Sequence, residues 1–239
     1  MSIVPFLRPP AGLLAWGPVA EAAQDRPRGA TKLFYRDSQA TEFRRRLREI
    51  LRLSDLRPTD RVLDVGCAEG WITLELASRV GHVHGFDPSV LRIDEAQRLA
   101  RERGIENATF EVGSVVDYPL EPLSYDVTMF SAVWGARGVG FDEFERLLRA
   151  SRRQLVARMQ IASEPERVPE IYDVCDRNDF DVLCFPRKFV VAVRRGTDCR
   201  IPQLPMLTVV PTSQLEDHEI VQMAEDIADT AGPSEQAAG

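Results

Sequence analysis

Short apolar runs and segments of helical spacing alternate through the middle of the chain. The runs predict strands at residues 62–65, 82–86, 108–112, 125–130 and 154–161. Between them, apolar residues recur every three or four positions and predict helices at residues 71–80, 90–103, 141–150 and 165–176. Because strands and helices alternate, the pattern predicts an α/β fold with a doubly wound, mostly parallel sheet.

Two further apolar runs, 180–185 and 189–193, are joined by only the three residues Pro186 to Lys188. A connection this short joins antiparallel neighbours, because a parallel pair needs a crossover of about a dozen residues or more. The pattern therefore predicts a seven-stranded sheet with an antiparallel final strand.

The regions on either side of this core have a different pattern. Residues 1–37 contain five prolines, which break any long regular element, and residues 38–52 predict a helix. We expect an N-terminal arm and covering helix at 1–59 and the core at 60–196. A C-terminal extension at 197–239 would hold a strand at 206–210, an acidic helix at 213–228 and a disordered end.

The composition is that of a soluble globular protein, with 44% hydrophobic and 28% charged residues. No apolar run approaches the roughly 20 residues that span a bilayer. The N-terminus also lacks the pattern of a secretory signal, so we expect a cytoplasmic protein without a membrane segment. Four cysteines and three histidines fit no zinc spacing, so we expect reduced thiols and no metal site.

The most informative stretch follows the first predicted strand. Gly66 and Gly70 flank a turn at the carboxyl end of this strand, where open α/β sheets bind ligands. Glycine there lets a ligand lie against the backbone. Asp87 ends the neighbouring strand, 17 residues after Gly70, and its carboxylate can accept hydrogen bonds from both hydroxyls of a ribose. These residues predict a site for an adenosyl group.

A dinucleotide site is the first alternative. Its Gly-x-Gly-x-x-Gly fingerprint would require glycine at positions 68 and 71, which hold Ala68 and Trp71. Asp64 and Glu69 would also bring negative charge near a pyrophosphate, whereas a cofactor that carries a sulfonium and an ammonium tolerates that charge. The charge favours S-adenosyl-L-methionine.

Four motifs in order resemble those of the class I S-adenosylmethionine-dependent methyltransferases, over residues 60–195. They are the segments 62–70, 85–89, 110–117 and 125–134, and the terminal hairpin matches the reversed last strand pair of that family. The resemblance implies a Rossmann-like methyltransferase fold, S-adenosyl-L-methionine as the cofactor, and an enzyme that transfers a methyl group.

By this resemblance, the residues that bind the cofactor come from the ends of the first four strands. They are Asp64, Gly66, Cys67, Ala68, Gly70, Asp87, Pro88, Ser114, Val115 and Ser131. The backbone at Gly66 and Cys67 would hold the methionine part, and Asp87 would hold the ribose. Asp64 would brace the loop or bind the amino group indirectly.

Ser114 and Val115 would contact the edge of the adenine in the same comparison. The sequence departs from the family pattern at two positions. Ala68 stands where a middle glycine is frequent, and Ser114 stands where an acid is often found. The departure at Ser114 bears directly on the adenine contact.

Methyl transfer from a sulfonium depends mainly on how the acceptor is oriented, so a dedicated base is optional. Four residues near the expected pocket are candidates for its lining: Tyr35, Trp134, Arg137 and Asp142. Asp142 is also expected to be the N-cap of its helix. His82 and His84 lie toward the start of the second strand, away from the cofactor, and are not expected to touch the substrate.

We expect a methyltransferase that acts on a small-molecule or saccharide-like acceptor, with oxygen slightly preferred over nitrogen. Methylation of RNA is the alternative; the arginines at 44–48 and 152–153 favour it if they share one face beside the pocket, and the net charge of −7 opposes it. A degenerate protein that binds the cofactor and serves as a regulatory or scaffolding partner is the third hypothesis, because the sequence shows no evident base.

Overall fold

The computed structural model describes residues 37–131, 140–158, 167–185 and 189–200. Within these ranges the chain forms twelve helices and strands. They are α4 (Asp37–Leu53), β1 (Arg61–Val65), α5 (Trp71–Ala77), β2 (His82–Asp87), α6 (Val90–Arg103), β3 (Ala108–Val112), β4 (Tyr125–Ser131), α7 (Phe141–Ala150), β5 (Ser151–Arg158), α8 (Val168–Asp176), β6 (Phe180–Phe185) and β7 (Phe189–Arg194).

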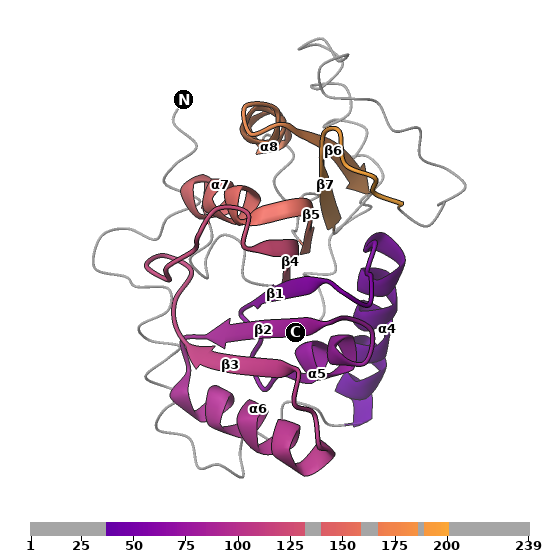
Figure 1. The fold of residues 1–239 in the computed structure, drawn as a ribbon, viewed down its shortest axis with the longest axis vertical. Helices are drawn as coiled ribbons and strands as arrows, with labels where there is room; N and C mark the ends of the chain where they lie inside the picture. The colour runs from indigo at the N-terminus through magenta and orange to yellow at the C-terminus, as the bar shows by residue number, and fades with distance from the viewer. Residues whose placement is uncertain (1–36, 132–139, 159–166, 186–188, 201–239) are drawn as a thin grey trace, which may run out of the picture.

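The seven strands form one sheet in the order β3-β2-β1-β4-β5-β7-β6, with β3 and β6 at its edges (Figure 1). Strands β1 to β5 pair in parallel, whereas β7 lies between β5 and β6 and is antiparallel to both. From β1 the chain adds β2 and β3 on one side of the sheet and then returns to add β4 and β5 on the other. The carboxyl ends of β1 and β4 therefore form the switch point at which open α/β folds bind ligands. The predicted sheet is confirmed.

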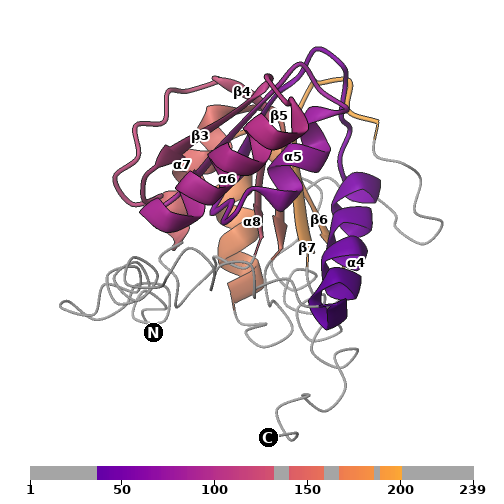
Figure 2. The same cartoon turned by 90° about the horizontal axis from the view of Figure 1, so that it is seen from below.

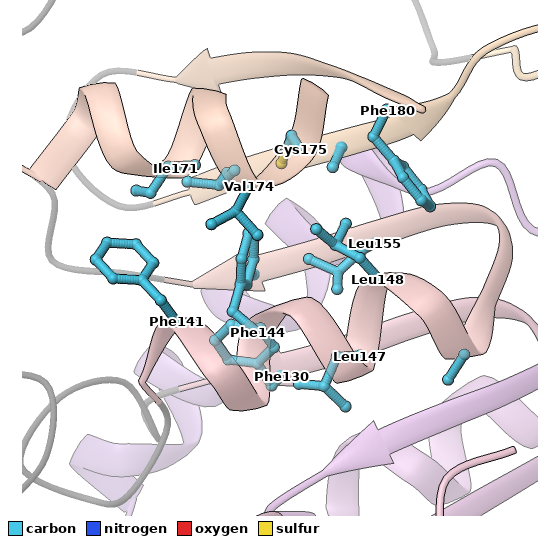
Figure 3. Packing of buried hydrophobic residues seen from close by; sticks show 14 of the residues in the cluster. Phe130, Phe141, Phe144, Leu147, Leu148, Leu155, Ile171, Val174, Cys175 and Phe180 are labelled. Atoms are coloured by element: carbon cyan, nitrogen blue, oxygen red, sulfur yellow. The ribbon is translucent and has the colours of Figure 1, made fainter. Parts of the chain in front are cut away.

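Alternate residues along each strand divide the core into two sides. Leu63 and Val65 of β1 face α7 and α8, together with alternate residues of the other strands. Figure 3 shows Phe141 and Phe144 of α7 packed beside Ile171 and other residues of α8. This side of the core is apolar and closely packed, as burial of the helix faces requires.

The opposite side of the sheet is covered by α4, α5 and α6 (Figure 2). Val62, one residue before Leu63, packs there against Ile50 of α4 and Leu76 of α5. The connection from β3 to β4, residues 113–124, contains no helix. Among the described residues, no helix is long and apolar enough to cross a membrane.

Strand β5 begins three residues earlier than the sequence predicts, at Ser151 rather than Gln154. The sequence prediction was wrong because it treated the charged Arg152 and Arg153 as outside the strand. Arg153 is buried beside two acidic residues, so its charge is compatible with an internal strand position. The predicted helix and strand beyond residue 200 lie outside the described residues.

Arg153 joins β5 to the segment that leads into β1. Its guanidinium donates to both carboxylate oxygens of Asp60, at 2.5 and 3.2 Å, and to the backbone oxygen of Asp55 at 2.6 Å. The neighbouring Gln154 accepts from the Asp55 N–H at 2.9 Å and donates to the backbone oxygen of Leu53 at 2.7 Å. These contacts fix the end of α4 and the start of β1 against the centre of the sheet.

We expect the Arg153→Met variant to lose about 3–5 kcal/mol of unfolding free energy, because it leaves the buried Asp60 carboxylate without its counter-charge. Arg152→Met is the matched control, since Arg152 lies next in the same strand and is exposed. Urea unfolding of both variants measures the difference. Equal losses would contradict a structural role for the Arg153–Asp60 pair.

Candidate functional site

The turn after β1 is held in place by the end of β2. The N–H groups of Gly66 and Cys67 both donate to the backbone oxygen of Phe86, at 2.9 and 3.0 Å. Gly70 has a φ of 74°, and a Cβ at this position would lie 2.7 Å from a ring carbon of Phe110. Glycine is therefore required at position 70 both by the backbone conformation and by close packing.

Ala68 occupies the left-handed region with a φ of 50°. This conformation costs an L-residue about 1–2 kcal/mol relative to the right-handed one. The Ala68 N–H donates to Oδ2 of Asp87 at 3.1 Å, which offsets part of that cost. The turn thus keeps the shape that a middle glycine would give it.

Asp87 connects three loops at the carboxyl end of the sheet. Its Oδ2 accepts from Ala68 and its Oδ1 accepts from the Ser89 N–H at 2.9 Å. Its backbone oxygen accepts from the Gly113 N–H at 3.1 Å. The N-cap of α6 is Ser89, so Asp87 supports the start of that helix without being its cap. Each carboxylate oxygen can accept a second hydrogen bond, as a ribose would require.

Asp64 lies in β1, two residues before Gly66, with 4% of its surface exposed. Its Oδ2 accepts from the hydroxyl of Thr73 at 2.6 Å. Burial raises the pKa of Asp64 to about 6, with a further contribution from the Asp87 charge and an opposing one from Thr73. A cation bound at this edge would stabilise the ionised form of both carboxylates.

The side chain of Cys67 points away from any ligand at the turn. It packs against Gly85, where an added Cβ would lie 2.9 Å from Cβ and 3.0 Å from Sγ of Cys67. Burial raises the pKa of the Cys67 thiol well above its usual value. Only the backbone of Cys67 is therefore suited to a role in the site.

The loop after β3 lies beside Asp87. Ser114 Oγ accepts from the Val116 N–H at 3.3 Å, and the Val115 side chain is buried in the core. The N–H groups of Ser114 and Val115 have no acceptor within the described residues. Any contact with an adenine edge would thus use the backbone here, because the Val115 side chain faces inward.

Tyr118 closes this loop over the sheet. Its ring stacks on Phe86 with centroids 4.2 Å apart and an angle of 9° between the planes. Its hydroxyl lies 2.9 Å from Nε2 of His84, and Nδ1 of His84 lies 3.2 Å from the Thr109 hydroxyl. Burial lowers the pKa of His84, which favours the neutral ring. His84 therefore supports the loop from below.

Arg146 of α7 is a residue that the sequence reasoning missed. It donates to three backbone oxygens of the loop, those of Val115 at 2.9 Å, Val116 at 2.7 Å and Tyr118 at 2.5 Å. Carbonyl groups in a non-helical loop need such donors. The sequence around Arg146 does not reveal this role, because Arg149 on the same helix has a similar sequence context and is exposed.

Three of the four pocket candidates, Tyr35, Trp134 and Arg137, lie outside the described residues. Ser131, predicted to bind the cofactor, ends β4, and its side chain is not described. Asp142 is described and exposed in the first turn of α7. The expectation that it caps the helix is wrong, because the N-cap is Gly140. Glu143 supports this end instead, by accepting from the Gly140 N–H at 2.8 Å. Pro88 is half-buried between Asp87 and Ser89.

Comparison with known families gives one decisive match. Residues 56–193, more than half of the chain, match the family described as "Methyltransferase domain". The chain belongs to this methyltransferase family. With the seven-stranded sheet, the match makes residues 56–193 a class I methyltransferase domain, a family whose cofactor is S-adenosyl-L-methionine.

Individual relatives of this methyltransferase are distant. The 23S rRNA (uracil(1939)-C(5))-methyltransferase RlmD of Klebsiella pneumoniae subsp. pneumoniae is 31% identical over 175 residues, which cover 71% of this chain and 35% of the relative. The chain thus spans about a third of the length of that relative. Magnesium protoporphyrin IX methyltransferase from Synechocystis PCC 6803, solved with bound SAM, shares the fold with a TM-score of 0.55 and 19% identity, covering 77% of this chain and 99% of that one.

The residues described here fit the cofactor of this methyltransferase family. Ionised carboxylates accept hydrogen bonds only, and the cofactor offers two ribose hydroxyls and an ammonium as donors. Asp87 would accept from the hydroxyls in addition to the N–H groups of Ala68 and Ser89, and Asp64 lies buried in β1 before the turn. When bound, the cofactor supplies an electrophilic methyl group on a sulfonium.

We expect the Arg146→Met variant to bind S-adenosyl-L-homocysteine about 5–20-fold more weakly, because three loop carbonyls lose their donor. Its preference for this ligand over the inosine analogue, which differs only in the purine, should also fall. Arg149→Met is the matched control on the exposed side of α7. Calorimetric titration measures all affinities, and an unchanged purine preference would contradict a positioning role.

Asp64 should make the stability of the cofactor-free protein depend on pH. Because its folded pKa is raised to about 6, the unfolded chain loses this proton at a lower pH than the folded protein does. The free energy of unfolding therefore falls as the pH rises from about 4 to about 6. Asp64→Asn keeps an acceptor for Thr73 and removes this loss.

We expect Asp64→Asn to be more stable than the wild type by about 1–3 kcal/mol near neutral pH and equally stable near pH 4, although it binds the cofactor more weakly. Urea unfolding at the two pH values tests this. The control is Asp117→Asn, which alters an exposed carboxylate. If Asp64→Asn and the wild type differ in stability by the same amount at both pH values, the pKa of Asp64 is not raised in the folded protein.

Proposed function

We propose that this methyltransferase acts on a small-molecule or saccharide-like acceptor and that an oxygen of that acceptor receives the methyl group. The observation that carries the proposal is the acidic character of the cofactor edge. Asp64, Glu69 and Asp87 lie there, all less than 5% exposed, with Arg92 as the counter-charge near two of them. A polyanionic acceptor would be repelled by this edge.

The same charge favours oxygen over nitrogen as the acceptor atom. An amine beside several carboxylates is held in its protonated form, because opposite charge nearby raises its pKa. A protonated amine has no lone pair with which to attack a methyl group. A hydroxyl is neutral, so the acidic edge does not block it in this way.

RNA is the second candidate acceptor, since one relative is an rRNA methyltransferase. The arginine pair at 152–153 does not favour it. Both residues lie at the start of β5, on the amino edge of the sheet, whereas Asp87 lies on the carboxyl edge. Arg153 is also buried and bonded to Asp60, so it is unavailable to a phosphate.

The arginines of α4 are the remaining support for RNA. Arg44, Arg45 and Arg48 are exposed. Arg48 donates to the backbone oxygen of Arg44 along the helix. An exposed helix face of this kind is the usual place for arginine in a soluble protein.

The test is a transfer assay that separates acceptor classes. The purified chain is incubated with methyl-labelled S-adenosyl-L-methionine and a cell extract, which is then divided into dialysable, ribonuclease-sensitive and protein fractions. We expect label in the dialysable fraction, stable to mild base treatment when the product is an ether. Asp87→Ala should abolish the labelling, because it removes the acceptor for the ribose hydroxyls.

Label in the ribonuclease-sensitive fraction would replace this proposal with RNA methylation. Cofactor binding without label in any fraction would favour the degenerate, regulatory protein. Labelling that persists in Asp87→Ala would show that a contaminating enzyme produces the signal.

A further inference from the structure

Glu69 is a buried acid in the turn between β1 and α5. It is 1% exposed, and neither of its carboxylate oxygens has a hydrogen-bond partner within the described part of the chain. A buried carboxylate in this state is strongly disfavoured unless another charge compensates it. A positive charge that binds near Glu69 would therefore stabilise its ionised form.

Arg92 of α6 compensates Glu69 only in part. Its Nε lies 3.7 Å from Oε1 of Glu69, and its Nη1 lies 3.9 Å from Oδ2 of Asp87. Both distances are longer than a hydrogen bond. One guanidinium thus lies between two buried carboxylates, which places Glu69 close to the ribose-binding residue.

A capping role does not explain Glu69. It precedes Gly70, the N-cap of α5, where a negative charge is favourable. However, its oxygens accept no N–H group of that helix or of any other described residue. Burial raises the pKa of Glu69, Arg92 and the N–H of Glu69 itself oppose this shift, and the charges of Asp87 and Glu95 add to it. The group is thus poised to respond to a further positive charge.

Substrate and product of the methyl transfer differ by such a charge. S-adenosyl-L-methionine carries a sulfonium, an ammonium and a carboxylate, whereas S-adenosyl-L-homocysteine has a neutral thioether in place of the sulfonium. The sulfur is attached to the carbon next to the ribose ring, so a cofactor whose ribose is held by Asp87 would bring its sulfonium charge near these acidic residues. A fixed charge at that range in a buried crevice changes a binding constant by about one order of magnitude.

We propose that Glu69 is a specificity-determining residue whose charge, held beside Asp87 by Arg92, favours the sulfonium cofactor over its neutral product. Release of the methyl group then weakens the attraction, and the product leaves more readily. The inference rests on the cofactor of the family and on the geometry of these three residues.

The experiment compares the affinities of S-adenosyl-L-methionine and S-adenosyl-L-homocysteine by calorimetry. In Glu69→Gln we expect the affinity for S-adenosyl-L-methionine, divided by the affinity for S-adenosyl-L-homocysteine, to fall by about 5- to 20-fold. The affinity for S-adenosyl-L-homocysteine itself should change by less than about two-fold. Glu75→Gln is the matched control, because it makes the same replacement on the exposed face of α5. Glu69→Asp keeps the charge and should keep the preference.

Arg92→Gln provides a second variant with the opposite expectation. Removing the guanidinium leaves the crevice more negative, so the preference for the sulfonium should increase. An unchanged ratio in Glu69→Gln, a fall in Arg92→Gln, or an equal weakening of both ligands would overturn the proposal. If Glu69→Gln does not fold, the change in the preference for S-adenosyl-L-methionine in Arg92→Gln decides: an increase supports the proposal and a decrease overturns it. A wild type that binds neither ligand would instead overturn the cofactor assignment.

Discussion

The site depends on the two hydrogen bonds that the Asp87 carboxylate accepts from backbone N–H groups. One comes from Ala68 in the turn after β1 and the other from Ser89 at the start of α6. The carboxylate is 2% exposed, and a charge-assisted hydrogen bond is strong in such surroundings. The same carboxylate that is suited to a ribose therefore also sets the shape of the turn on which the cofactor would lie.

This arrangement opposes folding in the absence of a ligand. Asp64, Glu69 and Asp87 bring like charges together in a buried place, and the pKa of both Asp64 and Glu69 is raised as a result. Asp87 and Asp64 hold backbone and side-chain donors of the turn and of α5, whereas Glu69 has no hydrogen-bond donor among the described residues. Active sites often combine such groups at the expense of stability, and a cationic cofactor relieves the repulsion when it binds.

Much of the fold could be predicted from the sequence because the strands are short, apolar and separated by turn residues. The ends of α6, β3, α7 and β6 agree with the prediction to the residue. The turn at Gly66–Gly70 and the position of Asp87 at the end of β2 could also be predicted, since both depend on local residue types. The start of β5 was not, because its charge partner Asp60 is 93 residues away in the chain.

Side chains that act across the fold could not be predicted for the same reason. Arg146 reaches a loop about 30 residues earlier in the chain, and no local pattern separates it from an ordinary surface arginine. The N-cap of α7 was misjudged because glycine gives a weaker signal than Asp142 two residues later. Long-range contacts thus decided the role of Arg146, whereas the N-cap of α7 depended on the weak local signal of a glycine.

Strand β7 runs against its neighbours and so returns the chain to the amino edge of the sheet. There the Arg200 N–H donates to Asp55 at 3.1 Å, and Arg57 contacts the backbone oxygen of Asp198. The last described residues are thus fastened on the side of the sheet away from Asp87. The chain therefore leaves Arg200 on the edge of the sheet opposite to Asp87, so the segment that follows begins a strand length away from the cofactor turn.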